Sequence, residues 1–369
     1  MGMVRSAQWL PFLLFGLIAG VIADRVQRKH LLVGTDISSS ILIFLIAGLA
    51  IGGVLTVPVL MVLVFALGLV TVLNGGTHQS FVADLLPAHL LTKGNVVLSQ
   101  SYTVAQTLGP VIGGLLVRLV GAPFTMVANA ISYALSALLM LRVPDVDSQR
   151  VPTRQSVLSD LREGFSYVYR HPTLAPYALS LHTWFIGNSV AGTVFVFRAA
   201  SIGLDSATIG LTLACAGVAG LLGAAMAEKT ATWLGLGVVV AVSDFCTGLG
   251  WLLIAIAPVG DTALWVICAG QVLYGVGFGA TGPLSGSFRN AVTPPQLRGR
   301  MNTTIRSFNW GLMAVAAPLG GWLAYAFGDR VALGIGGAII LISAAALASS
   351  RFRKAVMPGA ERPASVAPD

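Results

Sequence analysis

The sequence predicts an all-α membrane protein made of two similar helix bundles, and three observations predict it. The composition is 56% hydrophobic and only 10% charged, with a mean hydropathy of +0.84, so the chain favours lipid over water. The apolar residues gather into runs of about 20 residues, the length a helix needs to cross a bilayer. The pattern of the first half also recurs in the second half, as Pro87 does in Pro294, 207 residues later.

Eleven apolar runs follow one another along the chain. Each is expected to be a helix, because a helix satisfies its own backbone hydrogen bonds inside hydrocarbon. Five runs lie in the first half, at residues 10–23, 31–52, 58–79, 96–119 and 123–141. Six lie in the second half, at residues 173–197, 207–227, 235–257, 263–286, 305–327 and 331–350.

The long charged connection between the halves is the linker of the molecule. Within it, apolar residues recur at helical spacing, which predicts an amphipathic helix lying on the membrane surface: Val157, Leu158, Leu161, Phe165, Val168 and Tyr169. We therefore expect an N-terminal bundle at 1–142, a cytoplasmic linker at 143–172, a C-terminal bundle at 173–350 and a disordered cytoplasmic tail at 351–369.

The basic residues predict the orientation of the chain. Of the 22 Lys and Arg residues, 18 fall in alternate connections on one side, and cationic loops are retained in the cytoplasm. Arg5, Arg118, Arg198 and Arg330 are assigned to the opposite, outer side. The sequence thus predicts a multi-pass protein of the plasma (inner) membrane with a cytoplasmic C-terminus. The net charge of +8 reflects these anchors, so we expect a lipid bilayer and no nucleic acid as a partner.

The two copies of the repeat differ by one run. Subtracting the repeat distance from run 173–197 leads to a position before residue 1, so the first helix of the first copy is expected to be missing. A signal peptide around residues 10–22 is a competing explanation of the start, although cleavage would remove the counterpart of run 207–227. The chain could also be a non-transporting truncated fragment or a mis-started reading frame.

Several motifs resemble those of the major facilitator superfamily. The stretch GVIADRVQRKHLL at 20–32 is similar to the family signature Gly-x-x-x-Asp-Arg-x-Gly-Arg-Lys, with Gln27 in place of a glycine. The stretches LREGFSYVYRHPTL and LRGRMNTTIRS, which begin at Leu161 and Leu297, resemble the bacterial efflux branch that includes enterobactin-exporter-like carriers. The similarity covers residues 8–353.

The resemblance implies a proton-driven carrier of the rocker-switch type, in which two bundles surround a central cavity. It also implies a cytoplasmic gate, which by motif position comprises Gly20, Asp24, Arg25, Arg28 and Lys29, with Asp84 as an ion-pair partner. Asp24 is expected to lie at the N-terminal end of a helix that opens near Asn302, because the helix dipole stabilises an anion there. The alternative is that the basic residues only set the topology.

Polar and aromatic residues deep in the apolar runs are candidates for lining the cavity, because such groups are costly in lipid. These are His182, Trp184, Asn188, Gln271, Tyr274 and Gln106. His182 is the candidate for proton coupling, with a structural core histidine as the alternative. The GPVIGG stretch supplies helix-bending and packing candidates similar to a family motif associated with exporters: Gly109, Pro110, Gly113 and Gly114.

Motifs for phosphate binding, metalloprotease activity or a serine nucleophile are absent from the sequence, so we expect no enzyme, cofactor or metal site. The sequence favours a monomeric exporter of lipophilic or amphipathic small molecules. An importer of the same fold is the alternative, since sequence does not distinguish the direction of coupling.

Overall fold

The computed structural model describes residues 2–87, 90–144, 157–260 and 262–355. For some residues within these ranges, including 17–25, 82–84 and 106, only the backbone is described. The described chain forms α-helices joined by short connections, and two short 3-10 helices. It contains no strand in these ranges, as the composition predicts.

The helices before the linker are α1 (Gly2–Arg25), α2 (Arg28–Ile51), α3 (Val57–Leu85), α4 (Leu91–Val120) and α5 (Ala122–Leu141). The linker helix is α6 (Val157–Arg170). The remaining helices are α7 (Leu174–Ser201), α8 (Ser206–Leu234), α9 (Leu236–Ala255), α10 (Ala263–Val292), α11 (Arg298–Phe327) and α12 (Asp329–Ser349), and the short η2 (Pro295–Leu297) and η3 (Arg351–Lys354) precede α11 and follow α12.

Eight of these helices are long and apolar enough to cross a membrane by length and composition: α2, α3 as far as Gly75, α5, α8, α9, α10, α11 and α12. The predicted number of eleven spans is therefore not confirmed by this criterion. Among the described residues, α7 is long but interrupted by polar side chains such as His182 and Asn188, which lowers its mean hydropathy.

The internal repeat is confirmed by the helix boundaries. Adding 207 to the bounds of α4 gives the bounds of α11, and both helices end at a glycine with positive φ, Gly121 (φ 84°) and Gly328 (φ 88°). Glycine adopts this conformation without the steric penalty that a Cβ would bring. The packing repeats as well: α1 lies on α3 as α8 lies on α10, and α2 lies on α5 as α9 lies on α12.

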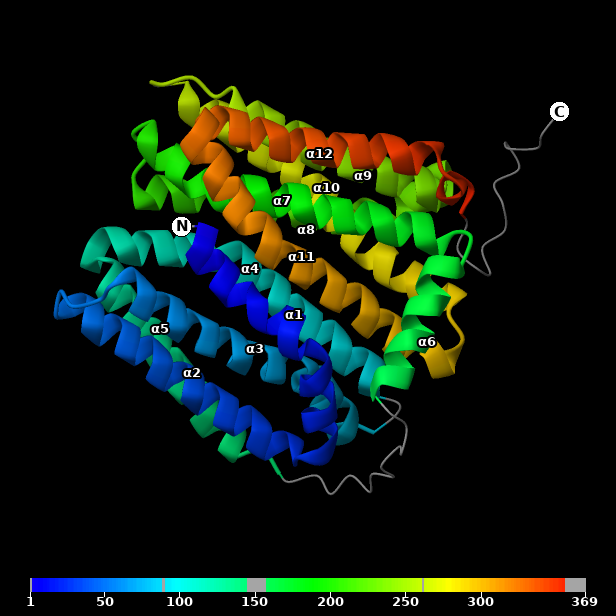
Figure 1. Ribbon diagram of the computed structural model, residues 1–369, viewed down its shortest axis with the longest axis horizontal. Coiled ribbons are helices and arrows are strands. Elements are labelled where there is room, and N and C mark those ends of the chain that lie inside the picture. Colours follow the sequence, from blue (N-terminus) through cyan, green and yellow to red (C-terminus); the bar gives the residue numbers. More distant parts are fainter. Residues whose placement is uncertain (1, 88–89, 145–156, 261, 356–369) are drawn as a thin grey trace.

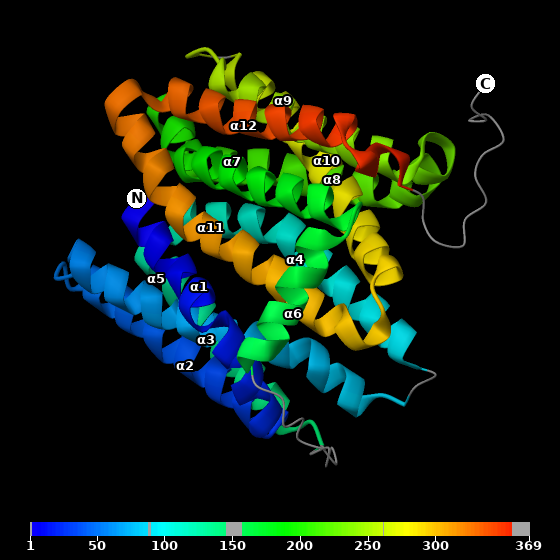
Figure 2. The same cartoon turned by 45° about the vertical axis from the view of Figure 1, so that its right-hand side comes forward.

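The two bundles lie side by side, with α6 across the long helices at one end (Figure 1). The bundles meet along two pairs of helices, α1 with α11 and α4 with α8. The view turned by 45° shows α6 over the end of α11 and α4 (Figure 2). We refer to this end as the α6 end, and to the opposite end as the Gly121/Gly328 end.

The C-terminal bundle is held together by close backbone contacts and two hydrophobic clusters. At the contact between α8 and α10, which we call the glycine seam, a Cβ on Gly275 would meet Ala216, one on Gly279 would meet Gly220, and one on Gly223 would meet Val276. Such small residues let helix backbones approach closely in a membrane. Gly275 and Gly279, four residues apart on α10, therefore serve helix packing.

Two boundaries differ from the predictions. Helix α1 begins at Gly2, not near residue 10. Of the polar residues in its first turns, Ser6 faces protein, and its hydroxyl donates to the Ala314 carbonyl at 2.5 Å. The predicted tail begins with η3, whose Phe352 is buried against Tyr177 and Phe288. Order therefore extends past residue 350; residues 356–369 lie outside the described residues.

Candidate functional site

The predicted gate motif lies at the junction of α1 and α2. Helix α1 ends at Arg25 and α2 starts at Arg28, after the extended Gln27 (φ −61°, ψ 119°). Of Gly20, Asp24, Arg25 and Asp84 only the backbone is described. Arg28 and Lys29 are partly exposed at the start of α2. Helix α11 starts at Arg298, four residues before Asn302, so its N-terminal end is earlier than predicted.

The aromatic residues of α7, α9 and α10 form one connected group on the inner side of the C-terminal bundle. Trp184 stacks on Phe278 with ring centroids 5.7 Å apart, and Phe278 stacks on Tyr274 at 5.9 Å. Tyr274 in turn contacts Trp251 edge-on at 5.2 Å. We call these four residues the aromatic ladder. Stacked and edge-on rings at these separations are favourable arrangements of aromatic side chains.

Two predicted cavity residues supply polar groups beside the aromatic ladder. Asn188 accepts a hydrogen bond from the Trp251 indole at 3.2 Å. Gln271, one turn from Tyr274 on α10, is 1% exposed, and its amide nitrogen lacks a hydrogen-bond partner among the described residues. A buried donor without a partner is costly, which makes Gln271 a group that a ligand or water would satisfy. The structure thus brings Trp184, Asn188 and Tyr274 together with Gln271 close by on α10.

His182 belongs to a different group, which lies between α6, α7 and α11. Its Nε2 is 2.7 Å from the Tyr169 hydroxyl and its Nδ1 is 2.5 Å from Asn309 Oδ1. Burial raises the pKa of Tyr169 to about 12, so its hydroxyl is a proton donor at neutral pH. A neutral His182 then accepts from Tyr169 and donates to Asn309, a tautomer assigned from these partners. Asn309 thus links α11 to α7.

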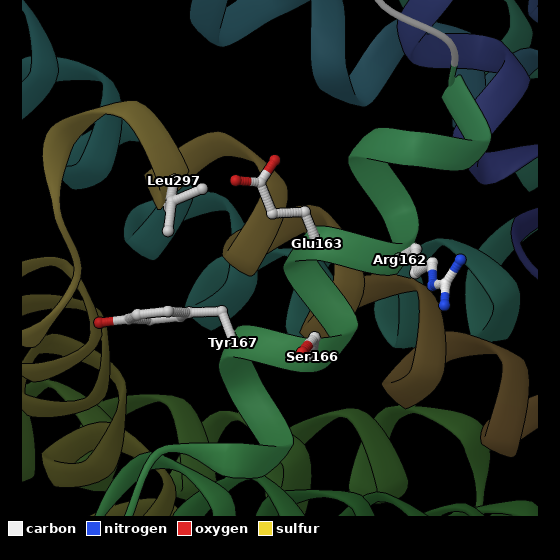
Figure 3. Close-up of a pocket in the computed structure, with 5 residues that line it drawn as sticks. All are labelled: Arg162, Glu163, Ser166, Tyr167 and Leu297. Atoms are coloured by element: carbon white, nitrogen blue, oxygen red, sulfur yellow. The ribbon is translucent and has the colours of Figure 1, made fainter.

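The linker helix α6 is fastened to the C-terminal bundle at several points. Glu163 forms an ion pair with Arg300, and the Tyr167 hydroxyl donates to the Val292 carbonyl at 2.6 Å. A pocket of about 450 Å³ lies at this contact. In Figure 3, Glu163 and Tyr167 extend toward Leu297, and Arg162 points away. The pocket is lined by exposed and partly exposed side chains of α6 and lies apart from the aromatic ladder.

The GPVIGG residues lie at the contact between α4 and α8. A Cβ on Gly114 would meet the Ser206 carbonyl, and Gly210 lies against the Pro110 carbonyl. Gly109 and Gly113 have open space around their Cα atoms, and the side chain of Gln106 lies outside the described residues. Nearby, Arg118 and Asp205 form an ion pair between the bundles at 3.3 Å. The close approach of α4 to α8 thus rests on Pro110, Gly114 and Gly210.

The sequence assigned Arg5 to the outer side, in the segment before the first apolar run, and the structure places it inside α1. Its guanidinium is 3.5 Å from the Thr193 hydroxyl of α7, at the long limit of a hydrogen bond. The guanidinium also lies near Tyr274 of the aromatic ladder, close enough for its charge to act on the phenol. No local pattern in the sequence signals this position, because the partners of Arg5 and Ser6 lie 188 and 308 residues away.

Comparison with known proteins supports one family across the chain. The family model described as "Major Facilitator Superfamily" matches residues 1–309 and 178–368. The chain is 27% identical over 163 residues to the staphyloferrin A transporter of Staphylococcus aureus, covering 42% of this chain and 41% of that protein. It is 26% identical over 343 residues to the multidrug efflux pump Tap of Mycolicibacterium fortuitum, covering 89% of this chain and 81% of that protein.

Among solved structures, the D-xylose-proton symporter has a similar fold. The TM-score is 0.73 at 14% sequence identity, and the match covers 96% of this chain and 88% of the symporter chain. A similarity at this identity shows the fold alone.

Proposed function

Because this chain belongs to the major facilitator superfamily of transporters, we propose that it is a proton-coupled exporter of lipophilic or amphipathic small molecules. The observation that carries the proposal is the aromatic ladder on the inner side of the C-terminal bundle, with Asn188 and Gln271 as its few polar groups. Binding sites for small molecules are mostly apolar and aromatic, with a few polar groups that fix orientation. The similarity to the efflux pump Tap supports export.

Proton coupling is proposed to pass through His182. Protonation would turn Nε2 from an acceptor into a donor, so the Tyr169 hydroxyl would lose its present acceptor and have to rotate or move. A proton on His182 would therefore disturb the contact between α7 and α6. Asp36, whose carboxylate accepts from Ser136 at 2.6 Å and from Asn74 at 3.3 Å, serves in this proposal as a structural group.

The cytoplasmic gate is proposed to consist of Gly20, Asp24, Arg25, Arg28, Lys29 and Asp84. In this proposal the α6 end faces the cytoplasm of the cell, with the C-terminus on that side of the plasma membrane. The excess of Lys and Arg in the connections at this end supports the orientation. At the other end, the Arg118–Asp205 ion pair and the contact of Gly114 with Ser206 would hold the outer side closed.

Inverted membrane vesicles containing the protein provide the test. Two dyes with the same ring system, fluorescein and rhodamine 123, are compared for accumulation in the vesicles with and without a proton gradient. We expect at least one of them to accumulate only with the gradient. Asp24→Asn should reduce this accumulation to that of empty vesicles at normal expression. Asp329→Asn, at the Gly121/Gly328 end of α12, is the matched control and should remain active.

Gradient-dependent accumulation that persists in Asp24→Asn would reject the gate assignment. Accumulation of neither dye would reject dye export. Accumulation only in right-side-out vesicles would instead favour an importer, the function that the name of the D-xylose-proton symporter suggests for a neighbour of this fold.

A further inference from the structure

Arg5 is a cation inside the membrane-spanning part of the molecule. Gly2, three residues earlier, packs against Ala317 and Pro318 of α11. Ala317 lies ten residues before Phe327, where α11 ends, which at 1.5 Å per residue is about 15 Å from that end. Thr193, the partner of Arg5, is eight residues from the end of α7, or about 12 Å. Arg5 is therefore well below the surface at the Gly121/Gly328 end.

Arg5 also lies on the inner side of the contact between the bundles. Helix α1 meets α11 through Gly2, Ser6 and Leu13, and it exposes Met3 and Leu14 on its outer side. The Arg5 side chain reaches across to α7, which belongs to the other bundle. It remains accessible there rather than being enclosed. Its position suits a group that a substrate between the bundles would touch.

A second arginine shares this inner side. Helix α11 turns Ser307, Gly311 and Ala314 toward α1 and turns Asn309 and Gly320 toward α7. The outer side carries the exposed Phe308, Val315 and Trp322. By helical periodicity Arg306 and Trp310 project between the α1 and α7 contacts, opposite that outer side. Arg306 is accessible, and it lies eight residues along α11 from Ala314, the partner of Ser6, or about 12 Å.

Neither arginine has an acidic partner in the described part of the chain. The ion pairs found there join Arg118 to Asp205 and Arg300 to Glu163. An unpaired cation inside a membrane protein costs several kcal/mol and usually marks a pathway or a ligand. Gln271, eight residues from the start of α10, offers its unpartnered amide nitrogen at a depth similar to that of Thr193. The two guanidinium groups and the Gln271 amide nitrogen are all hydrogen-bond donors, so an anion would be a suitable partner for them.

Aromatic surfaces border these donors. Trp9, one turn from Arg5, contacts Trp310 edge-on at 4.9 Å, and Phe12 contacts Trp310 at 4.1 Å. Tyr274 of the aromatic ladder lies within electrostatic range of Arg5. A guanidinium one helical turn from a tryptophan suits a planar anion, because the guanidinium can pair with the acidic group while an aromatic ring stacks on the planar part.

We propose that the substrates of this protein are organic anions with a planar aromatic part, and that Arg5 binds the anionic group, with Arg306 as a second anion-binding position further along the path. This inference rests on the proposed transport function and names its substrate class. It narrows the proposed lipophilic or amphipathic substrates to those that carry a negative charge.

The test compares the two dyes that share a xanthene ring and differ in charge, the anion fluorescein and the cation rhodamine 123. Binding to the purified protein is followed by dye anisotropy at constant ionic strength. We expect fluorescein to bind at least tenfold more tightly than rhodamine 123. Arg5→Gln should weaken fluorescein binding about tenfold and Arg306→Gln about threefold, because hydrogen bonds to charged groups are the stronger ones. Arg5→Lys should retain part of the affinity.

Binding of the cationic dye rhodamine 123 shows whether Arg5 recognises the anion or only supports the fold. Arg5→Gln should leave rhodamine 123 binding unchanged or tighter, whereas a misfolded variant would lose both dyes. Arg330→Gln, on α12 where its guanidinium donates to the Ala257 carbonyl, is the matched control and should bind fluorescein normally. Equal binding of the two dyes, or fluorescein binding that is unaffected in Arg5→Gln, would overturn the inference. If fluorescein binds but shows no gradient-driven flux, the assignment of Arg5 to anion binding holds and the transport proposal is rejected.

Discussion

The two bundles share one helix pattern, yet they differ in how the last two helices of each repeat are covered. In the C-terminal bundle α7 lies on α11 and α12: a Cβ on Gly320 would meet Val190, and one on Gly336 would meet Gly187. The counterparts 207 residues earlier are Gly113, which has open space, and Asn129, which is exposed. Equivalent positions therefore have different neighbours, and their tolerance of substitution should differ accordingly.

The uncovered side of α5 contains a groove. A pocket of about 390 Å³ is lined by Ser132, Leu135, Ser136, Leu139, Met140 and Val143. Ser136 is the counterpart of Ser343, whose hydroxyl is 2.8 Å from that of Ser180 on α7. In the N-terminal bundle the same position donates to Asp36 instead. The hydroxyl of Ser136 therefore finds its hydrogen-bond partner within the N-terminal bundle, in Asp36 of α2. The equivalent hydroxyl of Ser343 finds its partner in Ser180 of α7.

The largest expected difference between the bundles comes from one substitution made at two equivalent glycines. Gly320→Leu would force α7 away from α11, because the nearest atoms are backbone atoms of Val190 that a side-chain rotation cannot move. Overpacking of this kind costs about 1–3 kcal/mol, and we expect a fall in Tm of about 5 °C or more. Gly113→Leu should change Tm by less than about 1 °C. Thermal unfolding in detergent measures both, and equal losses would show that the comparison is wrong.

A smaller effect is expected where α6 joins the C-terminal bundle. Tyr169→Phe removes the hydrogen bond to His182 and leaves the ring contacts with Phe165 and Phe308 in place. A hydrogen bond contributes about 1 kcal/mol, so amide exchange in α6 should quicken about fivefold. Exchange in α2 and α5 should be unchanged. Faster exchange in both bundles would mean that α6 is coupled to the whole molecule.

The smallest effect is expected at the exposed ion pair between the bundles. The Thr208 hydroxyl and backbone N–H hold the pKa of Asp205 below its usual value, with a further contribution from Arg118. A lowered pKa gives stability that is present above the unfolded pKa, about 3.9, and is lost as the pH falls through the folded pKa. Asp205→Asn should therefore leave Tm nearly unchanged at pH 7, since exposed ion pairs contribute little. The difference between the two proteins should vanish once the pH falls below the folded pKa of Asp205; a difference that grows there would contradict this assignment.

The helix pattern could be predicted from the sequence because a helix that crosses lipid needs a long apolar run. Long apolar runs, the repeat of Pro87 in Pro294 and the amphipathic spacing of α6 each indicate the observed element. The start of α1 was not accessible, because Arg5 and Ser6 lower the local hydropathy. Their partners, Thr193 and Ala314, lie 188 and 308 residues away, so the contacts that keep these side chains inside the bundle leave no local signal.

The candidate site was accessible in part. Trp184, Asn188 and Tyr274 stand out because aromatic and amide side chains are unusual within apolar runs, and the structure brings them together. His182 stands out for the same reason, but its partner Tyr169 comes from the surface helix, which hydropathy places outside the bundle. The approach of Arg5 to Tyr274 joins two helices of different bundles and follows from tertiary packing alone.

The glycine seam between α8 and α10 has a consequence for how the gene can vary. Every single-base missense change in a glycine codon introduces a residue with at least one more carbon atom. At Gly223, Gly275 and Gly279 that atom would overlap main-chain atoms of the facing helix. Random mutagenesis with selection for function should therefore yield almost no survivors at these three codons, while Gly282 and Gly286, further along the same helix in open space, should accept many replacements.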